Sequence, residues 1–480
     1  MKTKPFIHLF KTSIGNYLYD VNTDAILKIS KNLYNYLDNI DEFVDIDENL
    51  KEEIELLEGN GFLKGKPDRI VKHPATDYIN EYLENRVSSI VLQVTQNCNM
   101  KCSYCVYSGG YKNRTHNNSN MTFDMAKKGI DFLIDHSSDL EELLIAFYGG
   151  EPLLNFKLIK QCVEYIKEET LGRTVHFNMT TNLTLLTPEI AEFLYENKFS
   201  ILISMDGPEE IHDKNRVFAN GAKGAHKKVI ENIKYIKDTY PDWISKIQVN
   251  VVVDQREDFK TVNDYFKTEK IFSNIDILYS FISNNNVKHK IIMSDECKLN
   301  EEYEYFKLLL YKIGKIKKNS ISPLLIKDNL LIGQNRLGKQ QLRRDRISSC
   351  THHGGPCIPG TRSLFMNVKG DFYPCEKVSE KYDFNCIGNI DEGFDYEKIY
   401  NMLNLENITS EECKNCWAYD YCTICIARVE KRDDSDEMNK QSIINVCPSI
   451  RKSIEEDFKD YVFLREIGYD FETDNLEKLK

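Results

Sequence analysis

The sequence contains no long hydrophobic segment. None of its apolar runs approaches the roughly 18 consecutive residues that a transmembrane helix needs, so we expect no membrane partner. The first ten residues include lysines but lack the apolar core of a secretory signal peptide. We therefore expect the protein to be cytoplasmic, where thiols stay reduced.

An excess of positive charge is also missing. The chain has 63 Lys and Arg residues against 75 Asp and Glu residues, and its formal net charge is −12. A general nucleic-acid-binding protein needs a basic face, so this balance argues against a nucleic-acid partner. Apolar residues make up 41% and charged residues 29% of the chain, which excludes a disordered or collagen-like protein.

Cysteine, in contrast, is abundant. The 480 residues include 14 cysteines, and in a reducing compartment clustered cysteines bind metal or carry redox chemistry more often than they form disulfides. Three of them fall within residues 98–105 and nine fall within residues 350–447. These two groups predict metal centres.

The length accommodates about three domains. Short β-rich runs followed by two helical patterns indicate a small α+β unit at the start of the chain, and strand and helix patterns then alternate. The predicted organisation is the α+β unit at 1–85, an α/β domain at 86–320, a linker at 321–347, a cysteine-rich domain at 348–450 and a helical tail at 451–480.

The linker carries a cluster of basic residues. Two readings are open, a solvated linker and a binding patch, and the first is favoured because charge runs are usually solvated. The residues are Arg336, Lys339, Arg343, Arg344 and Arg346.

The α/β domain contains six β-rich apolar runs separated by helical patterns. One of these helices is expected to begin at Thr122 and another after Asn155. Alternating strands and helices predict a parallel sheet or a partial barrel, with the working site at the carboxyl ends of the strands. The predicted strands are 87–95, 143–148, 174–180, 200–205, 246–254 and 276–283.

The first cysteine group directly follows the first of these strands. It has the spacing C-x3-C-x2-C, with Cys98, Cys102 and Cys105. Three thiolates in one loop can hold three irons of a [4Fe–4S] cluster, which normally takes four cysteines, and leave one iron open. A structural zinc or cluster site with a distant fourth ligand is the plainer alternative.

These residues resemble the radical S-adenosylmethionine (SAM) superfamily, whose signature is C-x3-C-x-aromatic-C; Tyr104 fills the aromatic place. The resemblance implies a partial (β/α)6 barrel. It also implies that the open iron binds SAM, whose cleavage gives a 5′-deoxyadenosyl radical that abstracts hydrogen from a substrate. The protein would bind, orient and exclude water, while the cofactors carry the chemistry.

Further matches to the family lie where a barrel would place them. Tyr148 precedes a Gly-Gly-Glu-Pro segment that looks like the family's SAM-ammonium loop, with glycines for close approach and a glutamate as acceptor. Asn182 and the Ser-Met-Asp-Gly segment at 204–207 resemble two other cofactor segments, although Leu183 stands where the family has glycine. The SAM-binding residues so implied are Tyr104, Gly149, Gly150, Glu151, Pro152, Asn182, Ser204, Asp206 and Arg216, the last as a partner of the SAM carboxylate.

The second cysteine group resembles the SPASM extension of radical SAM enzymes that modify peptides. It departs from that pattern in its last spacing, where two residues rather than three precede Cys425. The resemblance implies two auxiliary [4Fe–4S] clusters, and so three clusters in total. The first would use Cys350, Cys357, Cys375 and Cys425, and the second Cys413, Cys416, Cys422 and Cys447.

Two zinc sites are the rival for this region, because C-x2-C pairs also suit zinc. Of the three remaining cysteines, Cys162 lies on an apolar helix face and should be a buried thiol, and Cys386 is a spare ligand or an unligated thiol. Cys297 has no predicted role. Glu376 follows Cys375 and is a candidate general base, with a surface carboxylate as the alternative.

The α+β unit at 1–85 resembles, in pattern and position, the small winged domains that capture leader peptides. Such domains offer a sheet edge and a helix groove to a peptide. With the other resemblances it implies a maturase that forms cysteine thioether crosslinks in a ribosomally made, cysteine-rich precursor peptide, reduced by a flavodoxin- or ferredoxin-type donor. The alternatives are a sulfatase-maturating or carbon–carbon crosslinking relative and, with least support, a non-enzymatic electron carrier or zinc-stabilised interaction protein.

Overall fold

The computed structural model describes residues 4–40, 46–68, 70–107, 110–112, 117–170, 172–257, 259–325, 350–353, 357–471 and 475–476. The basic cluster of the predicted linker lies outside these residues. Within the described part of the chain, no helix combines the length and the apolar character needed to cross a membrane.

The α/β region forms six parallel strands in one sheet, as the alternating pattern predicted. The strands pair in the order β12-β11-β9-β8-β7-β5, so consecutive strands along the chain are neighbours. They are β5 (Ser89–Thr95), β7 (Glu142–Gly149), β8 (Thr174–Thr181), β9 (Ser200–Ser204), β11 (Ile247–Val253) and β12 (Asp276–Phe281).

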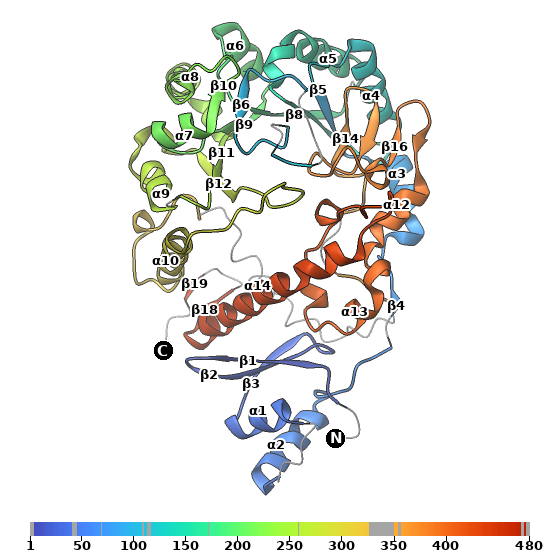
Figure 1. Ribbon diagram of the computed structural model, residues 1–480, viewed down its shortest axis with the longest axis vertical. Helices are drawn as coiled ribbons and strands as arrows, with labels where there is room; N and C mark the ends of the chain where they lie inside the picture. The colour runs from blue at the N-terminus through green and yellow to red at the C-terminus, as the bar shows by residue number, and fades with distance from the viewer. Residues whose placement is uncertain are drawn as a thin grey trace.

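Helices α4 to α9 connect these strands and pack apolar side chains against the sheet, and α10 follows the last strand (Figure 1). The Thr122 side chain caps the first of them by accepting from Met125 N, as expected. The α5 helix begins directly after Asn155. The helices are α4 (Phe123–Asp135), α5 (Phe156–Glu169), α6 (Pro188–Glu196), α7 (Glu209–Asn215), α8 (Ala225–Thr239), α9 (Phe259–Thr268) and α10 (Asp295–Lys312).

The cysteine-rich region continues the same sheet. Strand β14 (Leu364–Met366) pairs in parallel with β5, and three antiparallel strands extend the sheet from there. Gly370 turns the chain between β14 and β15 with φ of 91°, a conformation that favours glycine. The added strands are β15 (Asp371–Tyr373), β16 (Gly388–Asn389) and β17 (Gly393–Phe394).

The rest of this region consists of helices. They are α12 (Tyr396–Leu403), the short 3₁₀ helix η8 (Leu405–Thr409), α13 (Ser410–Lys414) and α14 (Lys440–Glu466). Helix α14 contains Cys447 and runs across position 450, where the sequence suggested a boundary. The small strands β18 (Tyr469–Asp470) and β19 (Asn475–Leu476) follow it.

The N-terminal unit is a three-stranded antiparallel sheet with two helices on one face (Figure 1). Its other face packs on α14 through aromatic side chains: Tyr19 lies 4.8 Å, between ring centroids, from Phe458. Its elements are β1 (Ile7–Thr12), β2 (Gly15–Asp20), β3 (Ala25–Ile29), α1 (Lys31–Asp38) and α2 (Glu48–Gly59). The strand β4 (Ile70–Val71) and helix α3 (Ile79–Asn85) lead into the barrel, and β4 pairs with β13 (Cys350–Thr351).

Candidate functional site

The first cysteine loop leaves the carboxyl end of β5 and is fixed by a second pair of strands. Strand β6 (Met100–Cys102) pairs antiparallel with β10 (Arg216–Phe218), and this register places Cys102 opposite Arg216. Further backbone hydrogen bonds join Ser103 N to Asn215 O at 2.9 Å and Ala219 N to Asn99 O at 2.8 Å. The loop is therefore held on both sides of Cys102.

The three thiols of this loop lie together. Cys98 interacts electrostatically with Cys102 and Cys105, and Cys102 with Cys105. Burial raises the pKa of Cys98 to about 12 and that of Cys102 to about 11, so both are protonated thiols without a metal. The nearby Arg216 charge favours the Cys102 thiolate. Three converging thiols beside a cation fit a cluster bound by three thiolates.

The Gly-Gly-Glu loop at the end of β7 is pressed against the start of the cysteine loop. Gly150 N donates to Thr95 O and Glu151 N to Asn97 O, both at 2.9 Å. A Cβ atom on Gly149 would overlap the Thr95 carbonyl, and one on Gly150 would overlap the Asn97 carbonyl. The two glycines are thus required by the approach of one backbone segment to another.

Glu151 is fully buried and fixed by the end of β8. Its carboxylate accepts from Thr181 Oγ1 at 2.7 Å, Asn182 N at 2.8 Å and Leu153 N at 3.1 Å. Burial raises its pKa, while these donors oppose the shift. A carboxylate has about four acceptor positions, so Glu151 retains capacity for a further donor such as an ammonium group.

Asn182 connects the end of β8 to the cysteine loop. Its Nδ2 donates to Asn99 Oδ1 at 2.9 Å, and its Oδ1 accepts from Thr184. Leu183, which stands where the family has glycine, has φ of 61° and is buried. The left-handed backbone that glycine usually supplies is therefore present here with a leucine.

Arg216 forms a buried ion pair. Its Nε donates to Asp206 Oδ2 at 2.9 Å, and the Tyr104 hydroxyl donates to the same oxygen. Both charged residues are buried. Asp206 Oδ1 also accepts from Val252 N at 3.2 Å. This cluster joins the cysteine loop, through Tyr104, to the ends of β9 and β11.

The remaining predicted cofactor residues lie at the same edge of the sheet. Ser204 is the last residue of β9, and Pro152 begins the short 3₁₀ helix η2 (Pro152–Asn155) after Glu151. The structure thus brings all nine predicted SAM-binding residues to the carboxyl ends of β7, β8 and β9 and to the cysteine loop. Their contacts with a cofactor remain predictions.

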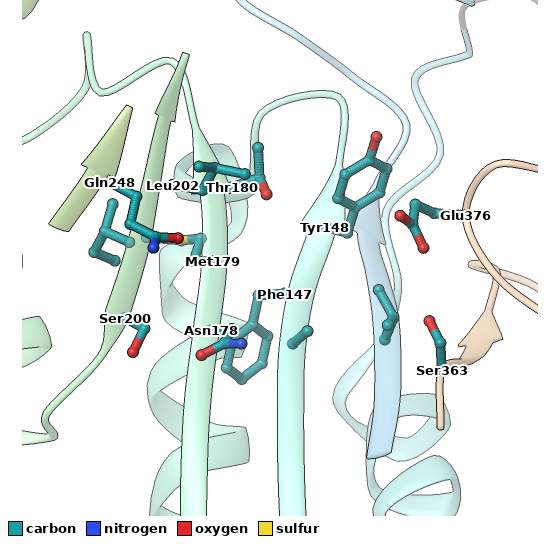
Figure 2. A pocket seen from close by; sticks show the side chains of 13 residues that line it. Phe147, Tyr148, Asn178, Met179, Thr180, Ser200, Leu202, Gln248, Ser363 and Glu376 are labelled. Atoms are coloured by element: carbon teal, nitrogen blue, oxygen red, sulfur yellow. The ribbon is translucent and has the colours of Figure 1, made fainter. Parts of the chain in front are cut away.

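A cavity of about 280 Å³ opens on the inner face of the sheet (Figure 2). Figure 2 shows Asn178, Ser200 and Gln248 projecting from neighbouring strands on one side, and Tyr148 and Glu376 on the other. Glu376, the candidate base, is thus contributed by the cysteine-rich region but lines the barrel. A polar cavity with one carboxylate can hold a peptide side chain and accept its proton.

The described auxiliary cysteines fall into two groups. Cys375 interacts electrostatically with Cys357 and Cys425. Cys413 and Cys422 each interact with Cys416 and Cys447. Burial raises the pKa of Cys375 and of Cys413 to about 11 and that of Cys422 to about 12. These are the sets that the family's connectivity implies, and their ligand roles remain a prediction.

The other cysteines differ from these groups. The backbone of Cys350 is placed in β13, but its side chain lies outside the description. Cys162 is fully buried on α5, as predicted, and Cys297 is buried on α10. Cys386 donates to Gly388 O at 3.4 Å, and the charges that shift its pKa come from Asp371, Lys398 and Asp383 rather than from cysteines.

Two further residues hold the parts of the site together. Thr181 donates to Glu151, and Asn99 ties the cysteine loop to Asn182. Asn99 lies inside the C-x3-C segment, and Thr181 precedes Asn182 in the segment that resembles the family's. Both positions were visible in the sequence, but the bond from Thr181 to Glu151 depends on the pairing of β7 with β8.

Comparison with known proteins decides the family of this site. Residues 92–266 match the Radical SAM superfamily. The chain carries a radical SAM domain. A radical SAM domain implies SAM and one [4Fe–4S] cluster, and the three thiols of the first loop fit that cluster.

Proteins similar to this chain include maturases. The chain is 26% identical over 356 residues to a cysteine-type anaerobic sulfatase-maturating enzyme of Clostridium novyi, covering 70% of this chain and 86% of that protein. It is 29% identical over 328 residues to an uncharacterised protein of Methanocaldococcus jannaschii, covering 68% and 93%. It is 24% identical to the radical SAM cyclopropyl synthase TigE of Paramaledivibacter caminithermalis, covering 72% and 69%.

The fold of this chain is also found in a solved structure. Native anSMEcpe with bound AdoMet superposes with a TM-score of 0.55 at 21% identity, covering 79% of this chain and 97% of that one. At this identity the likeness concerns the fold.

Proposed function

We propose that this protein is a radical SAM oxidoreductase that removes two hydrogens from a side chain of a peptide or protein, in the manner of an anaerobic sulfatase maturase. Similarity to cysteine-type sulfatase-maturating enzymes over most of both chains supports this reading over the others. The observation that carries it is the polar cavity at the inner face of the sheet, with Glu376 at its wall.

The residues have separate roles in this proposal. Cys98, Cys102 and Cys105 hold the cluster that binds SAM, and Glu151 receives the SAM ammonium. When bound, SAM and the clusters supply the abstraction of one hydrogen atom and the uptake of one electron. Glu376 accepts the second hydrogen as a proton, so the substrate loses two hydrogens in all.

The auxiliary cysteines would hold two further [4Fe–4S] clusters. Support comes from the two groups of thiols described above and from Cys375, which is adjacent in sequence to Glu376. The proposed partners are the peptide substrate and a flavodoxin- or ferredoxin-type electron donor.

A second candidate is thioether formation in a cysteine-rich precursor peptide. A groove between β1 and α1 in the N-terminal unit favours it, because leader capture uses a sheet edge beside a helix. Strand β1 is an edge of its sheet, and the groove is lined in part by Ile7, Leu9, Leu37 and Ile40. In this reaction the carbon loses a hydrogen atom, the cysteine loses its proton, and one electron leaves as the C–S bond forms.

Anaerobic incubation with SAM, a reductant and a peptide tests both candidates by mass spectrometry. One peptide carries a single cysteine or serine, and the other is any cysteine-rich precursor encoded beside this gene. Either reaction removes two hydrogens. Side-chain oxidation creates a C=O or C=S group that reacts with a hydrazide. Crosslinking consumes a free thiol and creates no hydrazide-reactive group.

The Glu376→Gln variant tests the base. We expect it to form 5′-deoxyadenosine but to lower peptide product by roughly 10²–10⁴-fold. Glu392→Gln, at an exposed carboxylate, is the control and should keep full activity. Full product from Glu376→Gln would remove the base assignment, and no mass change with either peptide would contradict the proposed function.

A further inference from the structure

Three buried side chains converge outside both cysteine groups. His352 Nε2 lies 3.1 Å from Glu406 Oε1, and His353 Nε2 lies 3.4 Å from Glu406 Oε2. The exposed fractions of the three side chains are 6%, 2% and 1%. The donor atoms of all three residues lie within 4.8 Å of one another.

The arrangement aims both imidazoles at one carboxylate. The two histidines follow β13 directly, and Glu406 lies on η8. The rings of His352 and His353 are stacked, with centroids 4.7 Å apart and planes 18° apart. Both Nε2 atoms therefore face the same side, where the two oxygens of Glu406 lie.

The position of the hydrogen on the His353 ring determines what its Nε2 atom presents to Glu406. Its Nδ1 lies 3.3 Å from Cys422 O, and a carbonyl oxygen can only accept, so Nδ1 carries the hydrogen. In the neutral ring Nε2 then has a lone pair that faces a carboxylate oxygen. Two acceptors at this separation repel unless a proton or a metal ion lies between them.

Protonation of both rings would not balance the charge. Two stacked imidazolium ions would then face a single buried carboxylate. A third imidazole, that of His73, also lies against His352, with 4.2 Å between the ring centroids. A single proton on His353, or one divalent cation shared by two neutral imidazoles and the carboxylate, avoids this repulsion. The convergence of three buried ligand atoms within 4.8 Å of one another favours the cation. Bonds of about 2.0–2.1 Å in a tetrahedral site put ligand atoms about 3.3 Å apart, near the two separations observed.

We propose that His352, His353 and Glu406 bind one divalent first-row transition-metal ion, Zn²⁺ or Fe²⁺, in addition to the iron–sulfur clusters. Two imidazoles and one carboxylate suit either ion. The ion fastens the segment after Cys350 to η8, whose last residue, Thr409, is hydrogen-bonded to Cys413 Sγ at 3.2 Å. It thus joins a ligand segment of one auxiliary group to a ligand segment of the other.

Zinc analysis and X-ray absorption spectroscopy of the anaerobically reconstituted holoprotein test whether the bound ion is zinc. We expect about one zinc per chain with nitrogen and oxygen neighbours and without sulfur. Glu406→Gln should weaken zinc binding at least about tenfold. His8→Gln is the matched control, since it alters a histidine that pairs with Glu455 at 3.1 Å and not with Glu406, and it should keep the zinc.

Mössbauer spectroscopy of protein reconstituted with isotopically enriched iron tests whether the bound ion is Fe²⁺. We expect a high-spin ferrous signal beside the cluster signals, which Glu406→Gln removes and His8→Gln retains. A wild-type holoprotein with neither zinc nor this signal would overturn the proposal, as would zinc surrounded by sulfur. No SAM or peptide is present, so the result is independent of the proposed reaction.

Discussion

At the scale of single residues, the site depends on contacts between backbone segments. Gly150 packs on Asn97 one residue before the first cysteine, so the Gly-Gly-Glu loop and the cysteine loop fix each other. Any side chain at position 150 would have to move the start of the cysteine loop. The glycine that the family resemblance assigns to cofactor approach is therefore also needed without the cofactor.

Gly150→Ala tests this contact. We expect it to destabilise the protein by about 1–3 kcal/mol, because overpacking displaces the Asn97 backbone, and to lower iron bound at the first loop. Anaerobic denaturant unfolding and iron analysis measure both effects. Gly59→Ala is the control, because a Cβ there meets nothing within 4 Å, and a helical alanine should stabilise by about 0.5–1 kcal/mol. Equal stability of the two variants would contradict the packing argument.

Residue types at the site were predictable from the sequence, but several of their partners were not. The spacing of Cys98, Cys102 and Cys105 pointed to one loop, and the structure brings their thiols together. The expected pairing of Arg216 with a SAM carboxylate stays a prediction, but the bond from its Nε to Asp206 was not predicted. That pair forms because β10 lies beside β6, and such a non-local pairing leaves no periodic signal. In the same way none of His352, His353 and Glu406 was singled out in the sequence, because their approach depends on packing between β13 and η8.

At the scale of elements, strands and helices with clear periodicity were predicted within a few residues. The run 143–148 became β7 at Glu142–Gly149, and the run 276–283 became β12 at Asp276–Phe281. The pairing of β14 with β5 was not predicted, because three residues of a short strand carry no information about a partner so far away in the sequence. The predicted winged and SPASM identities of the outer units stay predictions.

The N-terminal unit offers a test of leader capture that leaves its packing against α14 intact. Deletion of the unit would expose the aromatic face of α14, including Phe458, so a point change in the groove is cleaner. Leu9→Glu places a charge in the groove beside β1, and we expect at least about tenfold weaker binding of a leader-bearing peptide, since a charge replaces an apolar contact. Fluorescence anisotropy measures this affinity.

Ile14→Glu is the control for the groove variant. Ile14 is 40% exposed in the turn between β1 and β2, so the same change there should leave peptide binding unaltered. If Leu9→Glu binds the peptide as the wild type does, the groove is not the capture site.

At the scale of the whole molecule, the cysteines predict a metal inventory. Four irons per cluster give about twelve irons per chain, and the triple change of Cys98, Cys102 and Cys105 to alanine should leave about eight. Iron and sulfide analysis after anaerobic reconstitution measures this. Cys162→Ala and Cys297→Ala, at buried thiols outside the three groups, should keep the wild-type count. An unchanged count in the triple variant would contradict the first cluster assignment.

The ten-stranded sheet has a consequence for how a substrate moves. Because β14 pairs with β5 and β15 pairs with β14, the strand that precedes Glu376 belongs to the same sheet as the strand that leads into Cys98. Hydrogen bonds along these strands resist a change in their spacing, so we expect the spacing to stay constant through turnover. In the proposed reaction, the peptide would then have to adapt its own conformation to a rigid site.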